Sequence, residues 1–90
     1  MVAFKDINPQ APTHLLVIPT EHVPSLAELT LSHTSLLGQL LQFAGRLARQ
    51  YQLADSGFRV VVNTGRDAGQ TVHHLHAHLL GGRALRWPPG

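Results

Sequence analysis

The clearest hydrophobic pattern in this chain lies at residues 35–51, where apolar side chains recur every three or four positions. That spacing places them on one face of an α-helix and leaves glutamine and arginine side chains on the other. The apolar face comprises Leu36, Leu37, Leu40, Leu41, Ala44, Leu47, Ala48 and Tyr51. We therefore expect one main amphipathic helix at 35–51, preceded by a shorter helical turn at 25–29.

Three shorter segments have the composition of β-strands. Residues 2–6 are followed by two prolines within 8–12, which cannot donate ladder hydrogen bonds and favour a turn. Residues 14–19 form a compact apolar run that ends at Pro19. Residues 58–63 hold three consecutive valines, a β-branched residue type common in strands. We expect strands at all three positions, the first two joined by the proline-rich loop.

Histidines alternate with apolar residues within the segment 69–82. His74, His76 and His78 are separated by single apolar residues. Because side chains on a strand point alternately to opposite faces, the pattern predicts one strand that presents three imidazoles from the same face. The preceding loop, 65–70, is too short for a helical crossover, so this strand should pair antiparallel with 58–63. Asn63 and the loop backbone would then lie beside the histidines.

The order of strand, strand, helix, strand, strand predicts an α+β fold, an antiparallel sheet of about four strands with the main helix packed on it. Ninety residues allow one domain, 1–90, which buries only about 60% of its unfolded surface or slightly more. With no cysteine to add disulfides or thiolate metal sites, we expect a dimer. The tail at 81–90 cannot continue the sheet and should lie on a surface or on a partner.

The charge pattern excludes several classes of function. Seven lysines and arginines face five acidic residues, and the charges are scattered singly, so no basic run predicts nucleic-acid binding. The apolar stretches are only a few residues long, and the N-terminus lacks a charged segment followed by an apolar one. We therefore expect neither a membrane span nor a signal peptide, and a soluble, cytoplasmic protein.

Two interpretations of the histidines involve no covalent chemistry. A structural role is poorly favoured, because each buried imidazole costs desolvation and needs partners for both nitrogens, whereas valine would stabilise the core better. A zinc site is possible because imidazole is a common zinc ligand. Alternate residues of one strand are nearly collinear and about 6.5 to 7 Å apart, so tetrahedral closure would need a further ligand, for which His14 is available.

Nucleophilic catalysis at phosphorus is the third interpretation. A neutral imidazole, with an ordinary pKa of about 6.5, can attack a phosphoryl centre while neighbouring groups donate hydrogen bonds to its oxygens. His76 has a histidine on each side, as such a nucleophile requires. Groups suited to binding the phosphate lie nearby in the sequence, namely Asn63, Gln70, Thr71 and the glycine-containing loop.

The motif at 74–80 resembles the signature of the histidine triad (HIT) superfamily of nucleotide hydrolases and transferases. The surroundings narrow the resemblance to the Hint branch, the nucleoside phosphoramidases. They include Pro-Gln-Ala-Pro-Thr-His at 9–14, Trp-Pro-Pro-Gly at 87–90, and the segments 4–8, 16–19, 61–63, 69–70 and 81–83. The resemblance covers nearly the whole chain.

The resemblance implies hydrolysis of nucleoside 5′-phosphoramidates, purine ones above all, through a covalent nucleotidyl-histidine and with no required metal or other cofactor. It also implies a homodimer with a continuous sheet. Three alternatives remain: a nucleotide-binding or scaffolding dimer with little turnover, a diadenosine polyphosphate hydrolase, and a zinc protein. The tail, with its segments 81–83 and 87–90, favours the phosphoramidase branch.

The resemblance also assigns catalytic roles. His76 would be the nucleophile that attacks the α-phosphorus, and His78 would donate to the phosphate oxygens. His74 would orient His76 and fix its tautomer. Thr71 stands where the family usually has a serine near the leaving group, and its hydroxyl keeps that role. His14 matches a conserved histidine of the family that supports the triad.

Substrate-binding roles follow in the same way. Asn63 and the backbone at Gln70 and Thr71 would hold the phosphate, and Asp6 the ribose hydroxyls. Phe4 and Ile7 would form part of the base pocket, and Trp87 would cover the active site of the partner or anchor the tail. From the residues alone, Asp6 and Asn63 could instead bond local backbone amides, and Phe4 and Ile7 could belong to the core.

The sequence also departs from the family pattern. Hint proteins usually have a helix and a β-hairpin before the strand that matches residues 2–6, where this chain begins. We expect the purine pocket to lack one wall and a strand edge to be unpaired. His73 replaces a larger residue and should pack on the face opposite the triad. His22 and His33 lie in polar connecting segments and should be surface residues.

Overall fold

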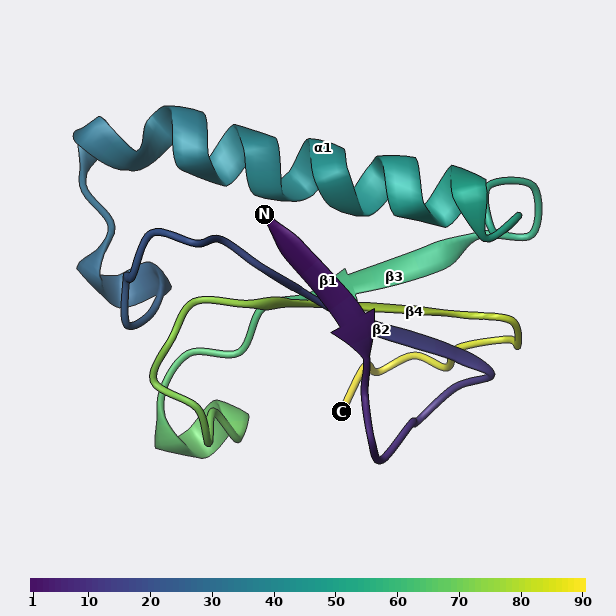
Figure 1. The fold of residues 1–90 in the computed structure, drawn as a ribbon. Helices are drawn as coiled ribbons and strands as arrows, with labels where there is room; N and C mark the ends of the chain where they lie inside the picture. The colour runs from purple at the N-terminus through teal and green to yellow at the C-terminus, as the bar shows by residue number, and fades with distance from the viewer.

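A four-stranded antiparallel sheet with one long helix across one face makes up the computed structural model, which describes residues 1–90 (Figure 1). The strands are β1 (Val2–Lys5), β2 (Thr13–Ile18), β3 (Phe58–Val61) and β4 (Ala77–Gly81), and the helix is α1 (Thr34–Gln50). Short 3₁₀ turns lie at Leu26–Glu28, Leu31–His33 and Arg66–Ala68. The predicted α+β class, the main helix and the turn at 25–29 are confirmed.

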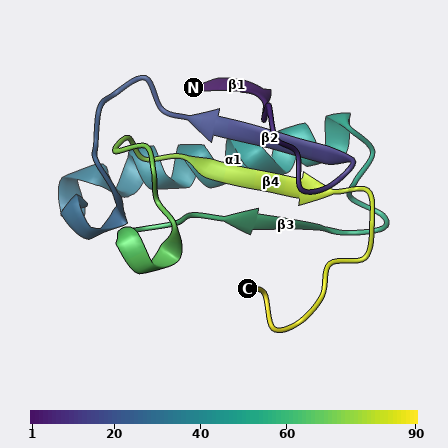
Figure 2. The same ribbon diagram turned by 90° about the horizontal axis from the view of Figure 1, so that it is seen from below.

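The strands lie side by side in the order β1-β2-β4-β3, and every neighbouring pair is antiparallel (Figure 2). The last strand in sequence, β4, is therefore inserted between β2 and β3. β3 and β4 are antiparallel neighbours, as predicted, but the connection between them runs over 62–76 and is longer than the expected loop at 65–70. β1 and β3 form the two edges of the sheet.

Alternate residues of the strands pack beneath the helix. Leu15 lies opposite Leu79, and Val17 lies opposite Ala77, and all four side chains are buried under α1. The helix contributes Leu40, Ala44 and Ala48, which have no exposed surface. Most of the stripe at three- and four-residue spacing is therefore the core-facing side of α1, but two of its predicted members are not buried: Leu41 is 50% exposed and Tyr51, just beyond the helix, is 41% exposed.

The intervening residues of the same strands point away from the helix. His14 and Leu16 on β2 belong to this second set, as do His78 on β4 and Val61 on β3. No helix covers this face, as Figures 1 and 2 together show. One-sided coverage therefore leaves His78 partly accessible from the uncovered side, whereas His14 is buried, with 7% of its surface exposed.

The histidine segment is less regular than its sequence predicts. β4 begins only at Ala77, so His78 lies on a strand whereas His74 and His76 do not. The partner strand β2 ends at Ile18, and Pro19 has no N–H to extend the ladder. The predicted single strand with three histidines is therefore wrong. Leu75 is nevertheless buried and its neighbouring histidines are half-exposed, so the alternation of faces continues beyond the strand.

Other strand boundaries also shift. β3 ends at Val61, so Asn63 follows the strand and is half-buried. His73 is exposed, so its predicted packing opposite the triad is wrong: the chain bends at this position and carries the side chain into solvent. No helix in the structure has the length and apolar character needed to cross a membrane.

The tail after β4 runs back outside the sheet, past β3 (Figure 2). Arg59 Nη2 on β3 donates to the carbonyl oxygen of Arg86 at 3.0 Å. Arg83 donates to the carbonyl of Gln10 from Nη2 at 2.8 Å and from Nε at 3.3 Å. These bonds hold the tail on the surface, as predicted, and leave Trp87 81% exposed.

Candidate active site

His76 lies just before β4 on the uncovered side of the sheet. Its Nδ1 is 2.7 Å from the carbonyl oxygen of His74. A carbonyl can only accept a hydrogen bond, so Nδ1 carries the proton, and Nε2 of the neutral ring keeps its lone pair. The backbone therefore fixes the tautomer in which the outer nitrogen of His76 can act as a nucleophile.

His78 is held by a chain of hydrogen bonds that starts at the backbone. The N–H of Gln10 donates to Nδ1 of His14 at 3.0 Å, so the proton of His14 is on Nε2. That nitrogen donates to Nδ1 of His78 at 2.9 Å. His78 therefore carries its own proton on Nε2, where it is available as a donor.

The surroundings of His78 favour its neutral form. Burial lowers the pKa of His78, and the neighbouring His76 and His14 lower it further, while Asp6 opposes the shift. The rings of His76 and His78 are adjacent, with centroids 5.2 Å apart and planes inclined at 62°. The two imidazoles thus form one unit, with an acceptor on the first and a donor on the second.

The side chain of His74 has a different environment from the other two. Its Nε2 donates to the carbonyl oxygen of Pro19 at 2.8 Å, and its Nδ1 lies 3.2 Å from Nδ1 of His22. The contact with His76 comes only from the backbone carbonyl of His74. His22 is exposed, as predicted, but its ring contact with His74 is not encoded in any periodicity of the sequence.

Asp6 follows β1 and bonds its own turn. Its Oδ1 accepts from the N–H of Asn8 at 2.8 Å, which is the local role that the residues alone predicted as an alternative. Its Oδ2 is 3.5 Å from Nε2 of His14. Asp6 therefore lies beside the same nitrogen of His14 that donates to His78.

Gln70 braces the loop between β3 and the histidines. Its Oε1 accepts from the N–H of Gly65 at 2.9 Å, and its Nε2 donates to the carbonyls of Pro24 and Val72 at 2.8 and 3.0 Å. Its side chain is thus fully engaged, which leaves backbone groups as the available donors. Thr71, the next residue, is exposed.

Comparisons with known proteins place the chain in a family. A family model described as the HIT domain matches residues 1–85. The chain belongs to the HIT family. Purine nucleoside phosphoramidase of Escherichia coli K12 is 45% identical over 85 residues, which cover 94% of this chain and 71% of that protein. A 14 kDa zinc-binding protein of Zea mays is 50% identical over 92 residues, covering 100% of this chain and 71% of that protein.

Solved structures share the fold of this HIT protein. A HIT family hydrolase from Legionella pneumophila superposes with a TM-score of 0.96 and 46% identity, covering 98% of this chain and 79% of that one. A HIT family hydrolase from Clostridium thermocellum gives a TM-score of 0.90 and 44% identity, covering 93% of this chain and 73% of that one. Together with the family match, these hydrolases show that the chain is a HIT-family hydrolase.

An apolar cavity of about 280 Å³ opens beside His76 of the HIT protein. It is lined by Phe4, Lys5, Asp6, Ile7, Leu16, Ile18, Val72 and His76. Phe4 is 48% exposed and Ile7 is fully exposed, so neither belongs to the core. Trp87 does not line this cavity within the single chain.

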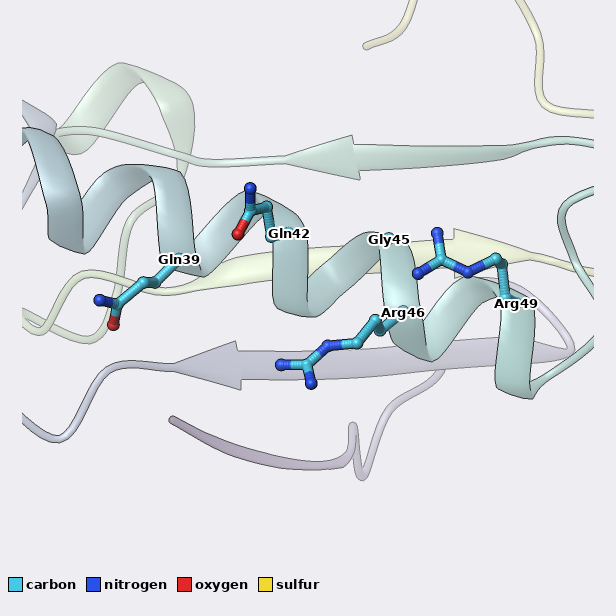
Figure 3. A pocket seen from close by; sticks show the side chains of 5 residues that line it. All are labelled: Gln39, Gln42, Gly45, Arg46 and Arg49. Atoms are coloured by element: carbon cyan, nitrogen blue, oxygen red, sulfur yellow. The ribbon is translucent and has the colours of Figure 1, made fainter.

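The largest hollow of the HIT protein, about 680 Å³, lies elsewhere. It runs along the outer side of α1 and is lined by Gln39, Gln42, Gly45, Arg46 and Arg49 (Figure 3). The side chains project from the helix in different directions, and none is apolar or a histidine. Although this hollow is larger, its lining offers no reactive group comparable with the histidine cluster on the opposite side of the sheet.

A metal could be held only by the groups that already form the hydrogen-bond chain. Asp6, His14 and His78 each offer one ligand atom, and these atoms lie within 4.8 Å of one another. A cation at this position would replace the proton that His14 donates to His78. A metal site and the chain of bonds are therefore alternatives at the same atoms of the HIT protein.

Proposed function

We propose that this HIT protein hydrolyses the P–N bond of purine nucleoside 5′-phosphoramidates through a covalent nucleotidyl intermediate on His76. Nε2 of His76 attacks the α-phosphorus, a bond forms between nitrogen and phosphorus, and the bond to the amine breaks. The amine takes up a proton from solvent and leaves, and the water that attacks in the second step returns a proton to solvent. Water then attacks the phosphorus, which releases the nucleoside 5′-monophosphate and restores His76.

One observation carries the proposal. The hydrogen bond from Nδ1 of His76 to the carbonyl of His74 prepares the opposite nitrogen as a nucleophile without a metal. Protonation of Nδ1 also suits the second step, because the imidazolium of the intermediate is a good leaving group. No cofactor is needed in this scheme.

The remaining roles concern binding and charge. His78, with its proton on Nε2, donates to the phosphate oxygens and stabilises the charge that develops on them. His14 keeps His78 in that tautomer. Asn63 and the backbone at Gln70 and Thr71 hold the phosphate, and the hydroxyl of Thr71 stabilises the departing amine.

The nucleoside occupies the cavity next to His76. Phe4 and Ile7 supply an apolar surface for the purine, and Asp6 accepts hydrogen bonds from the ribose hydroxyls. The purine and the P–N bond are chosen because the E. coli relative is a purine nucleoside phosphoramidase. The exposure of Ile7 leaves the base side open, which predicts weak discrimination between purines.

We also propose a homodimer with a sheet continuous across the two subunits. β3 is the last strand in the order β1-β2-β4-β3, so one of its edges has no neighbour in the chain. Phe58 on β3 and Leu41 on α1 are 41% and 50% exposed, which favours burial against a second copy. Trp87 would then reach the partner's cavity. Sedimentation velocity tests the oligomeric state, and a monomer at micromolar concentration would contradict the proposed dimer.

Hydrolysis of adenosine 5′-phosphoramidate in the presence of a chelator tests the proposal. The wild-type chain should release AMP, and folded His76→Ala should not. AMP binding without turnover in the wild type would favour a binding or scaffolding dimer. Loss of activity or of folding on chelation would favour a zinc protein, and a preference for diadenosine polyphosphates would assign a different substrate class.

A further inference from the structure

The segment before β4 is held by the segment that follows β2. The regular ladder between β2 and β4 ends at the pair Val17 and Ala77. Four contacts continue the association beyond it, three of them to backbone carbonyls. They are His74 Nε2 to Pro19 O, Leu75 N to Val23 O, Gln70 Nε2 to Pro24 O, and His22 Nδ1 with His74 Nδ1.

The fourth contact joins two imidazoles and has only one consistent assignment of protons. Nε2 of His74 must carry a proton because its partner, the carbonyl of Pro19, can only accept. In the neutral ring, Nδ1 of His74 is then an acceptor. The donor at 3.2 Å is Nδ1–H of His22, whose ring meets that of His74 edge-on with centroids 4.9 Å apart.

His74 in turn fixes the nucleophile. Its side chain is held at Nε2 by Pro19 and at Nδ1 by His22, and its carbonyl accepts the proton of His76 Nδ1 at 2.7 Å. Displacement of the His74 ring would rotate the local backbone and move that carbonyl. The tautomer and the direction of the His76 ring therefore depend on how firmly His74 is held.

We propose that His22 is a positioning residue for the reaction, acting on His76 through the ring and the carbonyl of His74. The kinetic part of this inference rests on the proposed function, whereas the tautomer of His74 is a property of the free protein. His22 touches neither the cavity nor the reacting atoms. It should therefore affect the rate of the chemical step and leave substrate binding unchanged.

Three variants separate this role from a general structural one. His22→Ala removes the donor. His22→Asn keeps an N–H close to the position of imidazole Nδ1, so it should preserve the bond. His73→Ala is the matched control, because His73 is an exposed histidine next to His74 with no side-chain hydrogen bond in the structure.

Long-range ¹H–¹⁵N correlation spectra of the full chain report the tautomer of each histidine. Wild type, His22→Asn and His73→Ala should all show His74 protonated at Nε2. His22→Ala should let the His74 ring leave the carbonyl of Pro19, so its spectra should show a mixture of the two tautomers. Its kcat for adenosine 5′-phosphoramidate should fall about three- to tenfold, the effect of losing one neutral hydrogen bond, with KM unchanged.

Either of two results would overturn the role of His22. One is a pure Nε2–H tautomer of His74 and unaltered kcat in His22→Ala. The other is an equal loss in His22→Asn and His22→Ala, which would indicate a need for the imidazole itself or for its bulk. If His22→Ala fails to fold, His22→Asn becomes the test. The proposal requires that this variant keep the wild-type tautomer of His74 and the wild-type kcat. An inactive wild type would count against the proposed function while leaving the spectra interpretable.

Discussion

Each residue of β4 pairs with a residue of β2, whereas residues 71–76 are held by side chains and by a single backbone bond to Val23. The ladder fixes His78, which has a supporting role in the proposed reaction. The nucleophile His76 lies outside it. This difference matters because a carbonyl within a ladder is directed at the neighbouring strand, whereas the carbonyl of His74 is free to accept from His76.

The departure from a regular strand therefore serves the proposed chemistry. With three histidines on an unbroken strand, the side chain of His76 would stand perpendicular to the sheet and away from the carbonyl of His74. The tautomer of His76 would then be unspecified. Pro19 ends the ladder at the point where the proposed mechanism needs a free carbonyl.

The largest predicted effect is on residues 71–76, the irregular segment before β4. His76→Ala should lower the hydrolysis rate at least about a thousandfold, because it removes the nucleophile and no neighbouring group can replace it. The side chain is half-exposed, so the free energy of unfolding should change little. Phosphoramidate turnover and urea unfolding measure the two effects. Residual activity within tenfold of wild type would rule out His76 as the nucleophile.

The core under the ladder should dominate stability. Leu79→Ala removes a side chain with no exposed surface and should lower the free energy of unfolding by about 2–5 kcal/mol. Val72→Ala, in the irregular segment, removes a side chain that is mostly exposed and should lower the free energy of unfolding by no more than about 0.5 kcal/mol. Urea denaturation of both variants tests the contrast. Equal losses would show that the ladder and the irregular segment share one packed core.

The loop beside the histidines should show an intermediate effect. Gly69 has φ of +82° and ψ of 24°, a left-handed conformation that other residues rarely adopt. Gly69→Ala should destabilise the fold by about 1–2 kcal/mol. Gly38→Ala is a control on the helix, where a Cβ meets nothing within 4 Å and alanine should be neutral or stabilising. An unchanged unfolding free energy for Gly69→Ala would contradict the need for glycine.

The smallest effect is the pH dependence contributed by His78. Burial, with His76 and His14, lowers the pKa of His78 in the folded state, so below its unfolded pKa of about 6.5 the unfolded chain binds more protons there. Stability should therefore decrease as the pH falls through 6.5 towards the lowered pKa. His78→Asn should reduce this slope in urea unfolding measured across pH 5–8. An unaltered slope would show that groups other than His78 cause the pH dependence of stability.

Much of the fold could be predicted from periodicity. The stripe at 35–51 is α1 within one residue at each end, because burial of a helical face requires that spacing. The extent of the histidine strand could not be predicted, since it depends on where the partner strand ends. Pro19 is visible in the sequence, but the pairing of β2 with β4 is a property of the assembled sheet.

The candidate site shows the same division. The triad residues and the apolar neighbours of His76 could be named from the motif and its resemblance to a family. The contact of His22 with His74 could not, because it joins residues 52 positions apart through irregular segments. Nor could the motif indicate that His74 acts on His76 through its backbone.

The most direct test of the account is to detect the covalent intermediate. Rapid quenching of the wild-type chain during turnover of adenosine 5′-phosphoramidate, followed by digestion and mass spectrometry, should reveal adenylate attached to His76 and to no other histidine. His76→Ala should give no adduct. An adduct on His74 or His78, or turnover with no protein-bound nucleotide at any quench time, would contradict nucleophilic catalysis by His76.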